Sequence, residues 1–221
     1  MIITIDGPAG AGKSTVAKLL AKRLGFEFLD TGAMYRAVTV AALRAGIDLH
    51  DQNDLARLAE SLRIELPGER VLLDGEDVTA EIRAPQVTAA SGPIASSRVV
   101  RERLVEWQRR IALGRDMVCE GRDQGTIVFP QAECKFFLSA DPKERARRRL
   151  RELQARGEKT TFNEVLATQE ARDARDAARD IAPMVPAADA VLLDTTDLPL
   201  DEVVARMVQE VWRRQGKPES V

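Results

Sequence analysis

The chain has little of several residue types that large classes of protein require. Aromatic residues make up 4% of its 221 residues, and the net charge is −2, so nothing predicts a nucleic-acid-binding surface. No apolar run approaches the roughly 20 residues that span a bilayer. A charged fraction of 31% also argues against a membrane protein. We therefore expect neither nucleic acid nor membrane among its partners.

The scarce histidine and cysteine residues give no catalytic or metal-binding pattern. The single histidine, His50, lies in a loop-like stretch and is not expected to act in catalysis. Cys119 and Cys134 lie at or beside predicted strands without a metal-ligand spacing, which predicts free, reduced thiols in a core. The chain runs from Met1 directly into an apolar, strand-like segment with no signal-peptide pattern, so we expect a cytoplasmic location.

Strand-like and helix-like patterns alternate along most of the chain. Five apolar runs are typical of strands buried on both faces: 2–5, 26–29, 117–119, 135–138 and 190–193. Helical periodicity is found at 13–24, 33–45 and 99–113, each followed by a glycine, and further helices are predicted from Pro142, from about 163 and over 200–214. Thr161 and Glu164 have capping-box spacing. The alternation predicts an α/β fold with a five-stranded parallel sheet and helices on both faces.

One region interrupts this alternation. Between residues 63 and 78, two short β-like pieces are joined by Pro67, Gly68 and Glu69 and followed by Asp74 and Gly75, which are hairpin signals. We interpret 47–98 as a small α+β insertion within a single domain of residues 1–221.

Residues 7–14 read GPAGAGKS and match the phosphate-loop pattern G-x-x-x-x-G-K-[ST] between a predicted strand and a predicted helix. The N–H groups of such a loop and the N-terminus of the following helix hold phosphates. Lys13 would bridge the β- and γ-phosphates, and Ser14 would hold Mg²⁺. A glycine-rich turn without a ligand is the alternative. The pattern predicts an ATP site, with Mg²⁺ as cofactor, formed by Gly7, Pro8, Ala9, Gly10, Ala11, Gly12, Lys13, Ser14 and Thr15.

Two further motifs follow predicted strands, at the sheet edge where α/β proteins bind ligands. Residues 30–36 read DTGAMYR, and residues 120–126 read EGRDQGT. The hydroxyl of Thr31 and the guanidinium groups of Arg36 and Arg122 suit a second phosphate. Taken alone, the first motif has the alternative of a helix cap with a surface charge, and the second that of a solvated, salt-bridged turn.

Arginines cluster in two stretches of the chain. In the segment 172–179, Arg172, Arg175, Asp176 and Arg179 share one helical arc, and Ala171, Ala174, Ala177, Ala178 and Ile181 lie opposite, where we expect them to pack. Three arginines on one stripe suggest an anionic partner, although charged helix faces are usually solvated. The segment 144–156 carries six arginines and is either a charged surface helix or part of a mobile lid that closes over ATP.

Together these motifs resemble the nucleoside monophosphate kinases, specifically the bacterial cytidylate kinases. The resemblance covers nearly the whole chain and includes ITIDGPAGAGKST (3–15), DTGAMYR (30–36), GEDVTAEIR (75–83), GRDQGTIVFP (121–130) and ARDARD (171–176) followed by IAPMVPAADA (181–190). It implies a P-loop kinase fold, with 47–98 as the part that binds the monophosphate and 144–175 as a helical lid. It also implies ATP and CMP or dCMP as small-molecule substrates, and a monomer.

The resemblance also implies roles for single residues. Lys13, Arg122 and Arg179 would be catalytic, and Asp176 would contact the sugar hydroxyls. CMP would be bound by Thr31, Arg36, Ser91, Arg101, Arg122, Asp123, Arg172 and Asp176. One residue more than the family pattern separates Ser91 from Arg101, so Arg98 and Arg103 are alternatives to Arg101. The family commonly has methionine where this chain has Gln124.

The alternatives to this interpretation differ in the acceptor. Another P-loop kinase would phosphorylate UMP, AMP, dTMP or a non-nucleotide such as shikimate. A nucleotide-dependent switch or binding module would hold or hydrolyse the triphosphate without an acceptor, which leaves the arginine stripe and Asp123 without a role. Nucleic-acid binding is a third alternative, and the composition argues against it.

Overall fold

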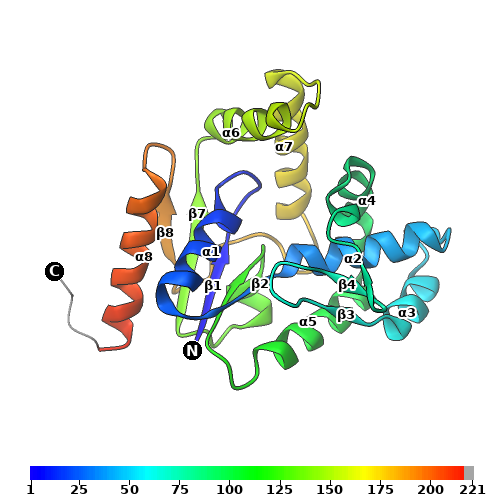
Figure 1. Ribbon diagram of the computed structural model, residues 1–221, viewed down its shortest axis with the longest axis horizontal. Coiled ribbons are helices and arrows are strands. Elements are labelled where there is room, and N and C mark those ends of the chain that lie inside the picture. Colours follow the sequence, from blue (N-terminus) through cyan, green and yellow to red (C-terminus); the bar gives the residue numbers. More distant parts are fainter. Residues whose placement is uncertain (217–221) are drawn as a thin grey trace. The chain divides into compact units, whose positions relative to one another are not determined.

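Five strands pair in the order β2-β6-β1-β7-β8, so neighbours in the sheet are distant in sequence, as crossovers between parallel strands require (Figure 1). They are β1 (Ile2–Asp6), β2 (Glu27–Asp30), β6 (Met117–Glu120), β7 (Cys134–Ser139) and β8 (Val191–Asp194). The predicted fold class, a five-stranded parallel sheet flanked by helices, is confirmed.

The computed structural model describes residues 1–216, which fall into two compact units. Unit 1 contains Met1–Phe28 and the chain from Arg115 on, and unit 2 is Leu29–Gly114. Unit 1 carries the helices α1 (Lys13–Leu24), α6 (Pro142–Ala155), α7 (Phe162–Ala177) and α8 (Leu200–Arg214), and a π-helical turn η2 (Gln124–Val128). The predicted limits 47–98 and 144–175 remain predictions.

The core of unit 1 lies where α1 and α8 pack on the central strands. Its fully buried side chains include Ile3 and Ile5 of β1, Leu20 of α1, Phe136 of β7 and Met207 of α8. In the register of the sheet, Ile3 is paired with Val118 of β6 on one side and with Cys134 of β7 on the other. This central position of β1 directs its carboxyl end, and the phosphate loop that follows, to the middle of the sheet edge.

Both cysteines are free and buried, as predicted. Burial raises the pKa of the Cys119 thiol and raises that of Cys134 to about 12. The thiols are therefore protonated at neutral pH and unreactive.

The last strand departs from the prediction. It spans Val191–Asp194 rather than 190–193, and it is not buried on both faces, because Leu192 is 66% exposed. The physical reason is its place at the sheet edge, beside β7 alone. Of the helix-start signals, Pro142 is at the first turn of α6 behind the cap of Asp141, and Thr161 and Glu164 form the predicted capping box of α7.

Helix α7 differs from its predicted orientation in two ways. It ends at Ala177, so Arg179 lies beyond the helix rather than on its surface. The alanines expected to pack, Ala171, Ala174 and Ala177, are exposed, whereas the helix buries Val165, Gln169 and Asp176. The side of α7 that carries Asp176 thus faces the protein, because its partners there are charged, while Arg175 remains exposed.

Unit 2 is helical with one small sheet. It contains α2 (Thr31–Arg44), α3 (Gln52–Ser61), η1 (Glu81–Arg83), α4 (Pro85–Ser96) and α5 (Arg98–Ala112). The predicted hairpin signals correspond to three two-residue strands, β3 (Ile64–Glu65), β4 (Leu72–Leu73) and β5 (Glu76–Asp77), which pair antiparallel in that order. Exposed Arg44 at the end of α2 forms ion pairs with Glu76 and Glu81, which connects the helix to this small sheet.

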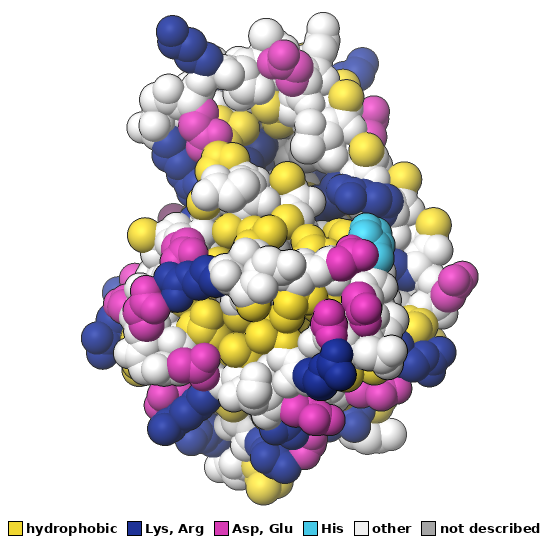
Figure 2. Space-filling view, turned by 90° about the vertical axis from the view of Figure 1, so that its right-hand side faces the viewer, with side chains coloured by type: hydrophobic (Ala, Val, Ile, Leu, Met, Phe, Trp, Pro, Cys, Tyr) yellow, Lys and Arg dark blue, Asp and Glu magenta, His cyan; other side chains and the backbone are white. Residues whose placement is uncertain are grey.

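Acidic and basic side chains are interspersed over the face drawn in Figure 2, in keeping with the net charge of −2. Within residues 1–216, every helix is too short or too polar to cross a bilayer.

Candidate active site

The phosphate loop connects β1 to α1 and is closely packed at its first residue. Gly7 has a φ of 136°, and a Cβ atom there would lie 2.0 Å from the carbonyl oxygen of Leu138 in β7, so only glycine fits. Gly12 immediately precedes α1 with a φ of 86°. Lys13 is folded back over the loop, and its Nζ donates to the carbonyl of Pro8 at 2.7 Å. The loop is thus held in a curved conformation at the N-terminus of a helix.

Lys13 is buried among charges of both signs. Only 5% of it is exposed, and burial lowers the pKa of its ammonium to about 7. That value already includes the guanidinium groups of Arg122 and Arg172, which also lower the pKa, and Glu120, 3.9 Å away, which raises it. A phosphate bound beside Lys13 would stabilise its charged form, because the anion would offset the repulsion from the guanidinium groups of Arg122 and Arg172.

Ser14 and Glu120 form a pair of oxygen donors beside Lys13. The Ser14 hydroxyl donates to Oε2 of Glu120 at 2.8 Å, and Glu120 is the last residue of β6. Hydroxyl and carboxylate oxygens are the donors that Mg²⁺ prefers. Among the described residues, no group of three or more His, Cys, Asp or Glu side chains could hold a metal by itself. The donor set therefore fits a Mg²⁺ ion that takes its remaining ligands from phosphates and water.

Asp6 links the phosphate loop to the turn that carries Arg122 and Asp123. It is buried, and its two carboxylate oxygens accept the backbone N–H groups of Gln124 at 2.9 Å and Gly125 at 2.8 Å. Burial raises the pKa of Asp6 to about 7 against the opposing effect of these two hydrogen bonds. Sequence reasoning passed over Asp6, although its place between a buried strand and Gly7 was a usable signal.

Three guanidinium groups converge on one carboxylate next to this turn. Asp176 of α7 is 4% exposed, and its oxygens pair with Nε of Arg122 at 3.1 Å, with Nη2 of Arg179, and with Nε of Arg172 at 4.0 Å. Arg122 and Arg172 are also close enough to influence Lys13. The structure therefore brings together five of the residues predicted from sequence, with Asp123, also buried, next to Arg122.

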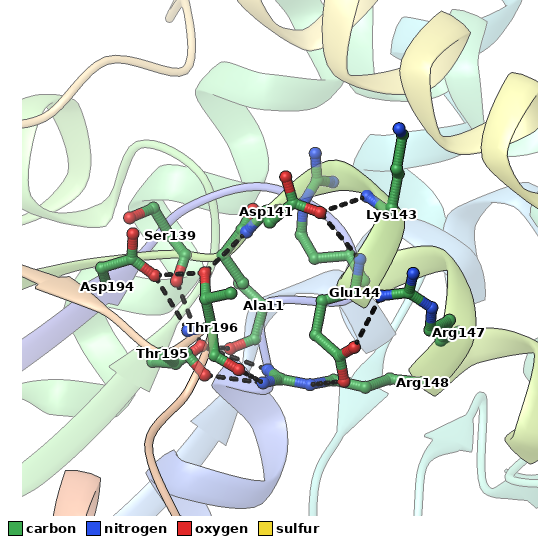
Figure 3. A network of polar contacts seen from close by, with 12 residues as sticks. Ala11, Ser139, Asp141, Lys143, Glu144, Arg147, Arg148, Asp194, Thr195 and Thr196 are labelled. Atoms are coloured by element: carbon green, nitrogen blue, oxygen red, sulfur yellow. Dashed lines mark hydrogen bonds and ion pairs between the residues drawn. The ribbon is translucent and has the colours of Figure 1, made fainter.

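Of the six arginines at 144–156, two are committed to the protein itself. Arg148 donates to the carbonyls of Thr195 at 2.6 Å and Thr196 at 3.0 Å, as Figure 3 shows. The Thr195 hydroxyl in turn bonds to the carbonyl of Ala11 in the phosphate loop at 3.2 Å. Arg145 is buried and also contacts the loop. Arg147 and Arg149 form ion pairs with neighbouring glutamates along the helix, and Arg151 and Arg156 are exposed.

Unit 2 contains the remaining predicted residues. Asp30 caps α2 by accepting the N–H of Ala33 at 2.9 Å, and it pairs with Arg36 at 3.2 Å. The helix cap that the sequence analysis gave as the alternative for this motif is therefore present. Thr31 is buried at the start of α2. Ser91 lies on α4 and donates to the carbonyl of Thr88 at 2.9 Å.

The choice among the three candidate arginines is informed by their surroundings in unit 2. Arg101 is buried, donates to the carbonyl of Ala95 at 3.1 Å, and has its guanidinium 5.6 Å from the centre of the Tyr35 ring. Arg98 is exposed at the start of α5, and Arg103 pairs with Glu106. An oriented, buried guanidinium is the better candidate for a ligand contact, which favours Arg101.

A phosphate loop at the centre of a parallel sheet edge, with buried lysine and converging arginines beside it, defines a P-loop phosphotransferase. A family model described as "Cytidylate kinase" matches residues 3–213. The chain belongs to the cytidylate kinase family, and so to the nucleoside monophosphate kinases.

Individual relatives agree with this placement. The chain is 52% identical over 214 residues to a protein named "Cytidylate kinase" from Pelotomaculum thermopropionicum, with 95% of each chain covered. It is 50% identical over 213 residues to one of the same name from Rhodopirellula baltica, covering 95% of this chain and 93% of the relative. Among solved structures, an uncharacterized protein from Eubacterium ventriosum has a TM-score of 0.54 at 12% identity, over 96% of this chain and 98% of that one, which is a likeness of fold alone.

Proposed function

We propose that the protein transfers the γ-phosphoryl group of ATP to CMP or dCMP, with Mg²⁺, to give ADP and CDP or dCDP. The observation that carries this proposal is the convergence of Arg122, Arg172 and Arg179 on Asp176 beside the buried Lys13. A switch or binding module needs a phosphate loop but has no use for a second group of guanidiniums. Membership of the cytidylate kinase family supports cytidine nucleotides as the acceptors.

The donor half of the reaction uses the phosphate loop. The N–H groups of residues 7–15 and the Lys13 ammonium would hold the phosphates of ATP. Ser14, with Glu120 behind it, would hold Mg²⁺, which when bound supplies positive charge to the phosphate oxygens. Lys13 would become fully protonated as phosphate arrives, because the anion stabilises its charged form.

The acceptor half needs orientation and positive charge rather than a base. A nucleoside monophosphate has a second pKa of about 6, so its attacking oxygen is already ionised at neutral pH. Arg122 and Arg172 would hold the acceptor phosphate, Arg179 would stabilise charge on the transferring group, and Asp176 would accept the sugar hydroxyls. Thr31, Arg36, Ser91 and Arg101 would contribute further contacts to CMP.

The base would be chosen by a carboxylate. Asp123 is a hydrogen-bond acceptor that pairs with the amino group of cytosine, whereas uracil presents a carbonyl oxygen at the same position. Its burial strengthens the discrimination, because an unpaired buried carboxylate is costly.

The proposal is tested by a coupled ADP-release assay across acceptors. We expect the highest kcat/KM with CMP and dCMP, and much lower values with UMP, AMP, dTMP and shikimate. Preference for another acceptor would overturn the proposed substrate, and slow ATP turnover unaffected by any monophosphate would favour a switch. The cytoplasmic location and the monomeric state stay predictions.

Asp123→Asn tests the choice of base. An amide presents either an oxygen or an amino group, so we expect the kcat/KM ratio of CMP over UMP to fall about 10–100-fold, against an upper limit of about 10⁴ for such sites. The ratio is measured with both acceptors at matched ATP. Unchanged values for both substrates would refute the role of Asp123.

A further inference from the structure

The peptide of Ala9, in the middle of the phosphate loop, is held from both sides by side chains of other elements. Its N–H donates to Oδ1 of Asp173 on α7 at 3.2 Å. Its carbonyl oxygen accepts a hydrogen bond from Nη1 of Arg145 on α6 at 2.9 Å. The two side chains are themselves an ion pair through Oδ2 of Asp173. The backbone of Ala9 is therefore held in a closed circuit of hydrogen bonds from two helices.

This circuit is protected from solvent. The side chain of Arg145 is 7% exposed and that of Asp173 is 16% exposed. Arg145 also donates through Nε to the carbonyl of Ala140, the first residue after β7, at 3.0 Å. Its guanidinium thus joins the end of β7, the phosphate loop and α7. Charge-assisted hydrogen bonds in such a setting are stronger than those at the surface, and removing one partner leaves the other charged and buried.

The next residue of the loop packs against the same two helices. Gly10 has a φ of 78°, and a Cβ atom there would lie 2.7 Å from Nε2 of Gln169 on α7 and 3.1 Å from Cβ of Arg145. The close approach at Gly10 and the hydrogen bonds at Ala9 place α6 and α7 directly on the loop. In Figure 1 these two helices lie beyond the carboxyl ends of β1 and β7, where the loop begins.

We propose that Arg145 and Asp173 are a positioning pair that clamps Ala9 and so sets the conformation in which the phosphate loop receives ATP. The pair orients the two peptide planes on either side of Ala9, and through them the N–H groups that follow. Arg145 then serves the loop rather than closing on ATP as a lid arginine, because its Nε and Nη1 donors bond to the end of β7, the loop and α7. The inference rests on the proposed binding of ATP, since a clamp on this loop has no other ligand to serve.

The test uses full-length protein with Asp173→Asn, Arg145→Lys and the double variant. The matched control is Glu170→Gln, which removes an exposed carboxylate from the same helix three residues earlier. Two quantities are measured: amide hydrogen exchange at Ala9 without nucleotide, and the dissociation constants for MgATP and for CMP, each alone. Thermal unfolding identifies any variant that fails to fold. If one of the two single variants fails, the test rests on the other.

We expect the Ala9 amide to exchange about tenfold faster in Asp173→Asn and Arg145→Lys, and MgATP to bind about tenfold more weakly, which corresponds to losing one charge-assisted hydrogen bond. CMP affinity should stay within about twofold of that of the unaltered protein. The double variant should be no worse than the worse single one, because the two side chains act as a unit. Glu170→Gln should match the unaltered protein in all three.

Three results would overturn the proposal. Unchanged Ala9 exchange would show that the contacts do not hold the loop. Equal weakening of MgATP and CMP would indicate a general structural role. Tighter MgATP binding in Asp173→Asn would mean that Asp173 acts by repelling phosphate. If the unaltered protein does not bind MgATP, the proposed function fails, and Ala9 exchange still decides whether the clamp exists.

Discussion

The two arginine-rich stretches of unit 1 have similar composition and different roles. On α6, Arg145 and Arg148 donate to backbone carbonyls, and the other four lie along the surface. Around the end of α7, Arg172 and Arg179, with Arg122 from the strand edge, gather on a single buried carboxylate. The first arrangement uses up the donors of arginine in holding the protein together. The second concentrates positive charge that one carboxylate cannot neutralise.

This difference shows what separates a structural arginine from one ready for a ligand. Each of the two α6 guanidiniums is shared between backbone carbonyls and one carboxylate of its own, Asp173 or Glu144, so its charge is balanced and its geometry fixed. Three guanidiniums around one aspartate leave an excess of positive charge, which an incoming phosphate can neutralise. The comparison predicts that substitutions in the second group change activity most, and those in the first group change stability or the phosphate loop.

The largest expected effect is that of Arg179→Ala on catalysis. Loss of a guanidinium that stabilises transferring charge should lower kcat by about 10²–10³-fold, with little change in unfolding free energy. The measurement is steady-state kinetics with CMP and ATP. Arg206→Gln, which breaks an exposed ion pair with Glu202 on α8, serves as the matched control and should leave kcat unchanged. A loss shared by both variants would contradict the comparison.

Arg148→Ala should mainly lower stability. Its side chain is 26% exposed and holds α6 to the segment after β8, and the carbonyls of Thr195 and Thr196 would lose a charged donor. We expect the unfolding free energy in urea to fall by about 1.5–3 kcal/mol. Arg149→Gln, one residue along, breaks only the surface pair with Glu152 and should cost about 0.5 kcal/mol or less. Equal losses would show that the two positions do not differ as the structure indicates.

The smallest effect concerns the pH dependence of stability through Lys13. Its folded-state pKa of about 7 lies below the ordinary value of 10.5, so the unfolded chain binds more protons between these values, and Lys13 makes the protein more stable as the pH rises through this window. Arg172 lowers this pKa, so Arg172→Ala should raise it and flatten the rise. Urea unfolding at several pH values between 7 and 10 measures this. If the unfolding free energy of Arg172→Ala rises with pH as steeply as that of the unaltered protein, Arg172 does not lower the pKa of Lys13. The control Arg149→Gln should retain the full slope.

The phosphate loop shows how far sequence reasoning extends. Its glycines, Lys13 and Ser14 are adjacent in the chain, and their backbone requirements are local, so the pattern alone predicted both the turn and the helix that follows. The parallel pairing of five strands followed from the alternation of apolar runs and helices, whereas the strand order came only from the structure. Asp6 and Glu120 were missed, because their partners are more than a hundred residues away in sequence.

Helix α7 marks the limit of such reasoning. Its period of charged and small residues was read from the sequence, but the face that packs was assigned to the alanines, and the structure buries Asp176 instead. A hydrophobic pattern decides orientation when apolar contacts dominate. Here, ion pairs with Arg145, Arg122 and Arg179 outweigh the small gain from burying alanine.

The sequence by itself determined the class of fold, the phosphate loop and the family, because these depend on local backbone chemistry and on motifs whose order is readable along the chain. Only the tertiary structure decided which arginines hold the protein and which gather around Asp176, and that Ala9 is held from two helices. The physical reason is that the energy of a charged group depends on its burial and on partners brought near by folding, neither of which its place in the sequence specifies.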